Sequence, residues 1–357
     1  MIGFVLALPI PLSAWLLSVP AGLFVLAGLV PFGSAVLYGA AVQVGTTREV
    51  LIRRLRLDAL RSAAAHAETS AGHQSEAKQL RRVASAERIH TEELTASLER
   101  VDAELALAEL IHRSLISPGM DHDDVQVAVR HVPHAFVGGD YVRVERPRDG
   151  LFYLCIGDVA GHGVAAALVV SRMHAMVQRL IGEEAAPAEF VRRLGHAARS
   201  LLVHTSLFVT FAVFKIELGS DVLEFATAGH PPQLLRRADG TLEELHTPNL
   251  PLGLARAHEL ASPRTGKTMI GPDDTLMLFT DGLFEVRGDR AESGHWGEES
   301  VAALFAGIGA NDVESVANGV LDAMRTYRGW RPSDDDVTVV VARIAPHPMR
   351  RTEPSGA

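Results

Sequence analysis

The order of apolar and polar positions predicts a set of strands and helices from about residue 122 onward. Residues 125–132 alternate between the two kinds, which is typical of a half-buried strand. Short apolar runs bounded by turn residues predict further strands at 151–159, 207–216, 222–229, 275–282 and 337–344. Longer apolar patterns predict helices at 163–181, 188–202 and 313–327. Antiparallel neighbouring strands with helices grouped apart indicate an α+β sandwich.

The N-terminal part of the chain has a different pattern. Its first 47 residues contain no Asp, Glu, Lys or Arg. This run is too long for one membrane span of about 20 residues and is long enough for two. We therefore predict two transmembrane helices over 1–46, with a buried helical hairpin, or one tilted span with a re-entrant piece, as the alternatives. The arginines that follow the run place the rest of the chain in the cytoplasm, as expected for a multi-pass protein of the inner (plasma) membrane.

Residues 47–117 contain no proline and are rich in Ala, Leu, Arg and Glu, which favours a helix. Apolar residues recur there with the 4, 3, 4 and 3 spacing of a coiled coil, at Leu94, Leu98, Val101, Leu105 and Ala108. One hypothesis is a helix packed on its own domain. The other is a coiled-coil linker that joins two copies into a homodimer and carries a signal from the membrane. Residues 347–357 are predicted to be a disordered tail.

Composition excludes several classes of protein. The formal net charge is −9, which argues against nucleic-acid binding. The single cysteine, Cys155, excludes an intramolecular disulfide and C-x-x-C metal sites. We expect its side chain to pack within a strand.

Aspartates stand where predicted strands meet loops. Asp140 follows two glycines, Asp158 and Asp281 each end an apolar run, and three aspartates at 334–336 precede the last strand. Each alone is explained by a helix cap or a turn. If the strands are neighbours, however, the carboxylates converge and repel one another. Divalent cations with a preference for oxygen ligands, Mg²⁺ or Mn²⁺, would relieve that repulsion.

Six motifs, in order, resemble one family. They are "VGGDY" at 137–141, "GDVAGHGVAAAL" at 157–168, "TAGHPPQLL" at 227–235, "LPLGL" at 250–254, "LFTDGLFEVR" at 278–287 and "DDVTVVVARI" at 335–344. Together with "LAELIHRSLISP" at 107–118, they make residues 105–345 similar to the bacterial SpoIIE/RsbU-type branch of the metal-dependent PPM protein serine/threonine phosphatases.

The resemblance implies an α-β-β-α sandwich over 118–346 with two Mn²⁺ or Mg²⁺ ions between the sheets. By motif, Asp140 and Asp158 bridge the metals, and the backbone carbonyl of Val159 is a further ligand. Asp281 and Asp335 complete the second site, Asp335 being chosen as the first aspartate of "DDVT". The nucleophile would be metal-bound water, so no side chain is expected to act as a catalytic nucleophile.

The resemblance also implies a substrate, the phosphoserine or phosphothreonine of a STAS-domain protein, the antagonist of an anti-sigma factor. A hypothesis of another class is a catalytically inactive, membrane-tethered binding module with this fold. A third is a metal-dependent phosphohydrolase acting on a small phosphate ester.

One position departs from the family pattern. Many members have an aspartate where this chain has Arg143, and a contact of Arg143 with substrate phosphate is a hypothesis for its role. His162 and His230 are candidate general acids, but we favour structural roles for both. Glu285 is interpreted as a turn residue or as support for a metal ligand.

Overall fold

The computed structural model describes residues 52–63, 74–134, 136–161, 163–205, 207–256, 258–289, 294–309 and 312–345. The predicted membrane hairpin at 1–46 and the predicted tail at 347–357 lie outside these residues. The chain divides into two units, residues 1–101 and 102–357.

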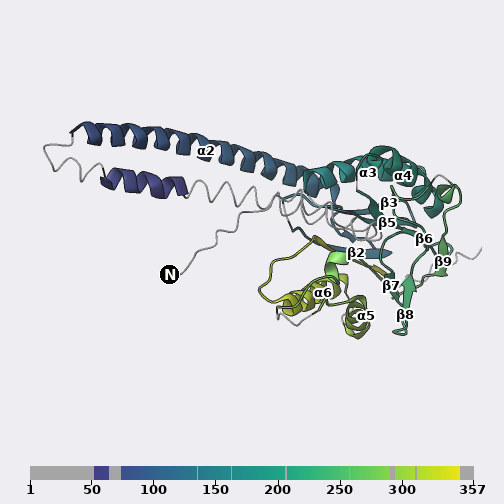
Figure 1. Ribbon diagram of the computed structural model, residues 1–357. Coiled ribbons are helices and arrows are strands. Elements are labelled where there is room, and N and C mark those ends of the chain that lie inside the picture. The colour runs from purple at the N-terminus through teal and green to yellow at the C-terminus, as the bar shows by residue number, and fades with distance from the viewer. Residues whose placement is uncertain are drawn as a thin grey trace, which may run out of the picture. The chain divides into compact units, whose positions relative to one another are not determined.

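The first unit contains a helix at 52–63 and the beginning of α2 (Gln74–Leu115), a helix of 42 residues (Figure 1). Ion pairs one turn apart lie along α2, such as Arg88–Glu92 at 3.6 Å. The prediction of a helix is confirmed for this segment. Of the predicted coiled-coil positions, Val101 is exposed and the other four are half-buried. The dimer stays a prediction.

The second unit is built on two antiparallel sheets. Sheet A contains, in spatial order, β1 (Met120–Asp121), β2 (Val125–Val132), β11 (Val337–Ile344), β10 (Thr275–Phe279), β7 (Gln233–Arg236) and β8 (Leu242–Leu245). Sheet B contains β3 (Asp140–Arg148), β4 (Leu151–Val159), β5 (Val209–Glu217), β6 (Val222–Ala228) and β9 (Gly266–Met269). The helices of this unit are α3 (Val164–Gly182), α4 (Pro187–Leu202), α5 (Glu298–Gly307) and α6 (Val313–Arg328), with short 3-10 turns at η2 (Glu259–Ala261) and η3 (Asp281–Leu283).

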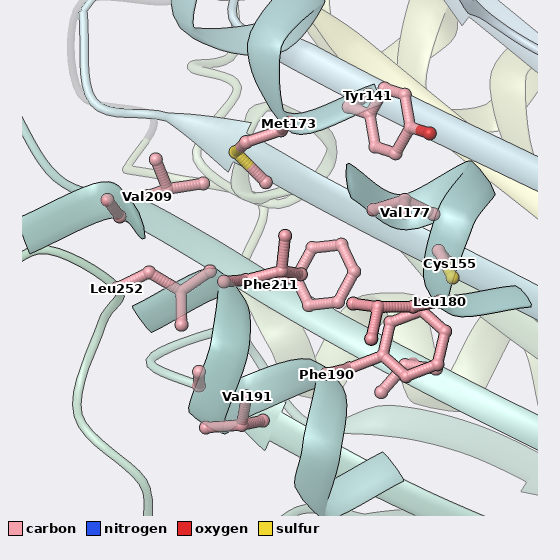
Figure 2. Close-up of a cluster of buried hydrophobic side chains, with 14 of the residues drawn as sticks. Tyr141, Cys155, Met173, Val177, Leu180, Phe190, Val191, Val209, Phe211 and Leu252 are labelled. Carbon is pink, nitrogen blue, oxygen red and sulfur yellow. The ribbon is translucent and has the colours of Figure 1, made fainter. Parts of the chain in front are cut away.

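Three hydrophobic cores separate four layers. One core lies between sheet B and the helices α3 and α4, where Phe190 and Phe211 are fully buried (Figure 2). The second joins the facing sides of the two sheets, and the third joins sheet A to α5 and α6. The order of layers is therefore α-β-β-α, which confirms the predicted sandwich.

Within the described residues, α3 is the one helix that is long and apolar enough to cross a membrane. Its buried residues share one face at helical spacing: Ala166, Val169, Val170, Met173, Val177, Leu180 and Ile181. They pack in the core beside sheet B. Core packing thus explains the apolar character of α3, and the two spans predicted over 1–46 stay a prediction.

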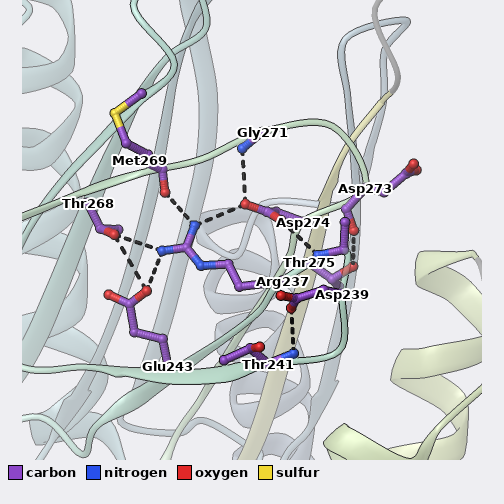
Figure 3. A network of polar contacts seen from close by, with 11 residues as sticks. Arg237, Asp239, Thr241, Glu243, Thr268, Met269, Gly271, Asp273, Asp274 and Thr275 are labelled. Carbon is purple, nitrogen blue, oxygen red and sulfur yellow. Dashed lines mark hydrogen bonds and ion pairs between the residues drawn. The ribbon is translucent and has the colours of Figure 1, made fainter.

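Arg237, directly after β7, joins the two sheets at one edge (Figure 3). Its guanidinium group donates to Asp274 at 3.0 Å and to Glu243 on the side of sheet A. It also donates to the Thr268 hydroxyl at 2.8 Å and to the Met269 carbonyl on β9 of sheet B. One side chain therefore satisfies acceptors from both sheets.

We predict that Arg237→Ala lowers the free energy of unfolding by about 2 kcal/mol, because it leaves partly buried acceptors without their charged donor. Urea unfolding followed by circular dichroism measures this change. The matched control is Arg325→Ala, whose exposed pair with Asp322 should contribute no more than about 0.5 kcal/mol. Equal stabilities of the two variants would contradict the role of Arg237.

Candidate metal centre

Four of the aspartates lie at one end of the sandwich, where ends of strands from both sheets meet. In sheet B, Asp140 of β3 lies opposite Asp158 of β4 in the strand register. In sheet A, β10 and β11 are antiparallel, so the end of β10 and the start of β11 lie at the same edge. Asp281 follows β10 and Asp335 precedes β11. The convergence that the sequence predicts is therefore a property of the strand pairing.

The Asp140 side chain points toward the opposite sheet. Side chains alternate along a strand, and Val142 and Val144 of β3 lie in the core between the sheets. The Asp140 carboxylate is 1% exposed and accepts hydrogen bonds from the Thr280 hydroxyl, at 2.9 Å, and from the Thr338 hydroxyl. Thr338 lies in β11 of sheet A, and Thr280 directly follows β10 of the same sheet. Asp140 thus links the sheets at the edge where the carboxylates meet.

The structure gives Asp335 and Asp336 different surroundings. Both carboxylate oxygens of buried Asp336 accept backbone N–H groups, from His134 at 2.7 Å and from Gly139 at 2.9 Å. Asp335 is exposed, and among the described residues its carboxylate accepts only the neighbouring N–H of Asp336, at 2.8 Å. Asp336 therefore holds the loop before Asp140, whereas Asp335 leaves an oxygen available.

The end of β4 and the loop after it offer further oxygen atoms. A methyl group built on Gly139 would lie 2.6 Å from the Val159 carbonyl oxygen, 2.9 Å from Asp158 Oδ1 and 3.0 Å from the Gly161 carbonyl oxygen. Three oxygens thus face one small space that glycine leaves open. Asp158 does not cap α3, because that helix begins after Gly163 and no side chain caps it. A helix cap is therefore excluded as the reason for Asp158.

Gly282 allows the turn after β10 to lie against the segment that precedes β11. A Cβ at this position would lie 1.9 Å from the backbone oxygen of Asp336. Only glycine allows the turn after Asp281 to contact the segment that contains Asp335.

The carboxylates raise one another's pKa values. Burial, and then repulsion from Asp158 and Asp336, holds the pKa of Asp140 well above its ordinary value. Burial, followed by repulsion from Asp281 and Asp335, does the same for the pKa of Asp158. Asp335 is exposed as a whole residue, but partial desolvation of its carboxylate, with repulsion from Asp281 as a smaller cause, raises its pKa to about 6. Burial and the charge of Glu285 raise the pKa of Asp281.

These donors suit a hard divalent cation. Carboxylate and carbonyl oxygens are the ligands that Mg²⁺ and Mn²⁺ prefer, and a cation would offset the repulsion. Across the described ranges, no three His, Cys, Asp or Glu side chains already stand at ion-binding separations. The features that make this site suit a divalent cation are therefore the set of oxygens that face Gly139, together with the buried carboxylates.

Other predicted residues do not join this centre. Arg143 lies on the strand face opposite to Asp140 and pairs with Glu145 at 2.8 Å, so the hypothesis of a contact with substrate phosphate at the aspartates is not supported. His230 is buried, with Nδ1 2.8 Å from the Thr210 hydroxyl, and burial lowers its pKa to about 3. His230 is therefore better explained as a neutral structural histidine than as a general acid.

The other candidate general acid, His162, lies outside the described residues. Cys155 is buried in β4, as expected.

Sequence reasoning missed the groups that support the aspartates. Thr280 and Thr338 hold Asp140, and His131 Nδ1 lies 2.9 Å from the Thr338 hydroxyl. His112, near the end of α2, is buried; burial lowers its pKa, and the nearby Asp336 carboxylate opposes that effect. The threonines beside the aspartates in "FTDG" and "DDVT" were the available signal.

We predict that Gly139→Ala weakens Mn²⁺ binding at least tenfold, because the added methyl group would occupy the space among the three oxygens. Isothermal titration calorimetry measures the affinity. Gly182→Ala is the control, since nothing lies within 4 Å of a Cβ there. Unchanged affinity in Gly139→Ala would exclude this space as part of the ion site.

A second prediction concerns pH in the absence of divalent cations. Because the pKa of Asp335 is about 6 in the folded protein and 3.8 ordinarily, the folded state binds the extra proton between these values. Ionised Asp335 therefore destabilises the fold above pH 6, and this penalty is lost as the pH falls. Asp335→Asn should be more stable than the parent at pH 7.5, with the difference shrinking toward pH 4.5.

Urea unfolding of both proteins across this pH range measures that difference, and the comparison cancels the titration of unrelated groups. A difference that grows as the pH falls would contradict the raised pKa of Asp335.

Comparisons with known proteins agree with this architecture. A family model described as Stage II sporulation protein E (SpoIIE) matches residues 148–345. The chain is 28% identical over 188 residues to phosphoserine phosphatase RsbP of Bacillus subtilis (strain 168), a match that covers 51% of this chain and 45% of that protein. The chain thus spans less than half the length of this curated relative.

Solved structures share the fold. The SiaA-PP2C domain of Pseudomonas aeruginosa matches with a TM-score of 0.59 and 22% identity, covering 70% of this chain and 99% of that one. The RsbU and RsbW domains of Rv1364c from Mycobacterium tuberculosis match with a TM-score of 0.54 and 25% identity, covering 65% of this chain and 62% of that one. Because the family model matches more than half of the 357 residues, the chain belongs to the SpoIIE family of PPM phosphatase domains.

Proposed function

We propose that this chain is a metal-dependent protein serine/threonine phosphatase. The observation that carries the proposal is the convergence of Asp140 and Asp158 from sheet B with Asp281 and Asp335 from sheet A at one edge. Asp140 and Asp158 would be ligands of both ions, the Val159 carbonyl would be a further ligand, and Asp281 and Asp335 would complete the second ion site. Two Mn²⁺ or Mg²⁺ ions suit this set of donors.

When bound, the ions would activate water for attack on the phosphoryl group and offset the charge of its oxygens. The protein's own part is to hold the ligands in place before substrate arrives. The threonine hydroxyls fix the orientation of the Asp140 carboxylate. Asp336 fixes the loop that contains Gly139, and so keeps the space among the oxygens open.

The substrate we propose is the phosphoserine or phosphothreonine of a STAS-type anti-sigma factor antagonist. The support is the match to phosphoserine phosphatase RsbP and to the RsbU domain of Rv1364c. The uncharged run at 1–46 supports a membrane anchor with the phosphatase domain in the cytoplasm.

The end of α2 supports a further part of this proposal, regulation of the metal centre through the helix. The helix ends at Leu115, and His112 near that end is buried close to Asp336. We propose that α2 joins two copies into a homodimer and that its position affects the order of the metal centre.

The test of the function is phosphate release from a phosphoserine protein in the presence of Mn²⁺ or Mg²⁺. We predict that Asp158→Asn lowers the rate at least 10³-fold, since it removes a charged ion ligand. Asp322→Asn, an exposed residue of α6, is the matched control and should leave the rate unchanged.

A folded parent protein that binds no metal and releases no phosphate would support the membrane-tethered binding module instead. Turnover of small phosphate esters but of no phosphoprotein would favour the third hypothesis.

A further inference from the structure

A groove next to the end of α4 has an unusual charge for this chain. It lies between the end of α4 and the loop at 250–258 and has a volume of about 520 Å³. We call it the α4 groove. Its lining includes Arg199, Leu202, Val203, Leu254 and Arg256.

The described residues that line the α4 groove include two arginines and no carboxylate. Neither Arg199 nor Arg256 has an ion-pair partner within the described ranges. The nearby Glu259 carboxylate is bound to the backbone N–H of Arg256. In a chain of net charge −9, this is a local excess of positive charge.

The rim of the groove is apolar and exposed. Val203 is 63% exposed and Leu254 is 55% exposed. Exposed large apolar side chains beside unpaired arginines are typical of protein interfaces, where arginine and apolar anchors occur together. The surface therefore fits a partner segment that offers both leucine-like side chains and carboxylates.

The backbone around the groove is held firmly. The Val209 N–H donates to the Leu252 carbonyl at 2.9 Å, and the reverse bond is 2.8 Å. Gly253 has a φ of 98°, and a Cβ there would lie 3.3 Å from Leu202 Cδ1. The loop that contains Leu254 and Arg256 is thus fixed against α4 without a ligand.

The groove is linked to the strand that contains Asp158 through Leu207, which lines the groove and precedes Phe208. The Phe208 carbonyl, between the end of α4 and β5, accepts the Ala160 N–H at 2.9 Å, two residues after Asp158. Val209 of β5 pairs with Val159 of β4 in the strand register. A protein bound in the groove is therefore held next to the loop of ligands.

We infer that the α4 groove binds an acidic, leucine-containing segment of the phosphoprotein substrate and thereby selects that substrate. This inference rests on the proposed phosphatase function and adds the surface that recognises the protein part of the substrate. Arginine suits this task because its guanidinium group binds carboxylates in a bidentate manner.

The probe is a fluorescent peptide with leucines and glutamates at helical spacing, titrated without metal onto the full chain in nanodiscs of uncharged lipid. We expect binding, and about tenfold weaker binding by the double variant Arg199→Glu and Arg256→Glu. Leu254→Ser should weaken binding as well. The control is Arg179→Glu, near the far end of α3, which should bind as the parent does.

A peptide with glutamine in place of glutamate should bind at least about tenfold more weakly to the parent. Circular dichroism establishes that each variant is folded. Equal peptide affinity of the parent and the folded double variant would overturn the inference.

Turnover separates this inference from the proposed function. With Mn²⁺, the double variant should have a raised KM for the same peptide carrying phosphoserine, and unchanged turnover of p-nitrophenyl phosphate. If the parent cleaves both esters and the variant has the same KM, the groove assignment fails and the function stands. If the parent cleaves neither ester but binds the peptide through the arginines, the function fails and the groove assignment stands.

Discussion

The hydrogen bonds of the Asp140 carboxylate to Thr280 and Thr338 are the contact on which the candidate site depends. Asp140 belongs to sheet B, Thr338 belongs to β11 of sheet A and Thr280 directly follows β10, so one buried side chain fixes how the two sheets meet at these strand ends. The cost of burying a charge between sheets is partly offset by the two hydroxyl donors. The remaining cost explains why the pKa of Asp140 is raised and why a cation would stabilise the site.

Much of this arrangement could be predicted from the sequence. The strands β4, β10 and β11 are continuous apolar runs, and the aspartates at their ends are visible as breaks in the pattern. Other elements were not predicted as strands or helices: β3, β7, β8, β9 and α5. The strand β3 begins directly after two glycines and ends in charged residues, and β7, β8 and β9 have only four residues each, so local pattern carries little information about them.

The supporting groups of the site were also beyond sequence reasoning. The hydroxyl of Thr338 and the carboxylate of Asp140 are separated by 198 positions, and only the packing of the two sheets brings them together. The distinct surroundings of Asp335 and Asp336 arise in the same way, since the partners of Asp336 belong to the loop before β3. The motifs place both threonines beside aspartates, but the residue that each hydroxyl contacts is decided by tertiary packing and cannot be read from the local pattern.

Anomalous X-ray diffraction from crystals grown with Mn²⁺ would test whether the four aspartates and the Val159 carbonyl bind two cations where the sheets meet. We expect two anomalous peaks, with Asp140 and Asp158 near both ions and Asp281 and Asp335 at the second. Asp336 should still be bound to the N–H groups of His134 and Gly139. Peaks elsewhere on the molecule, or a peak bound by Asp336 in place of Asp335, would contradict this expectation.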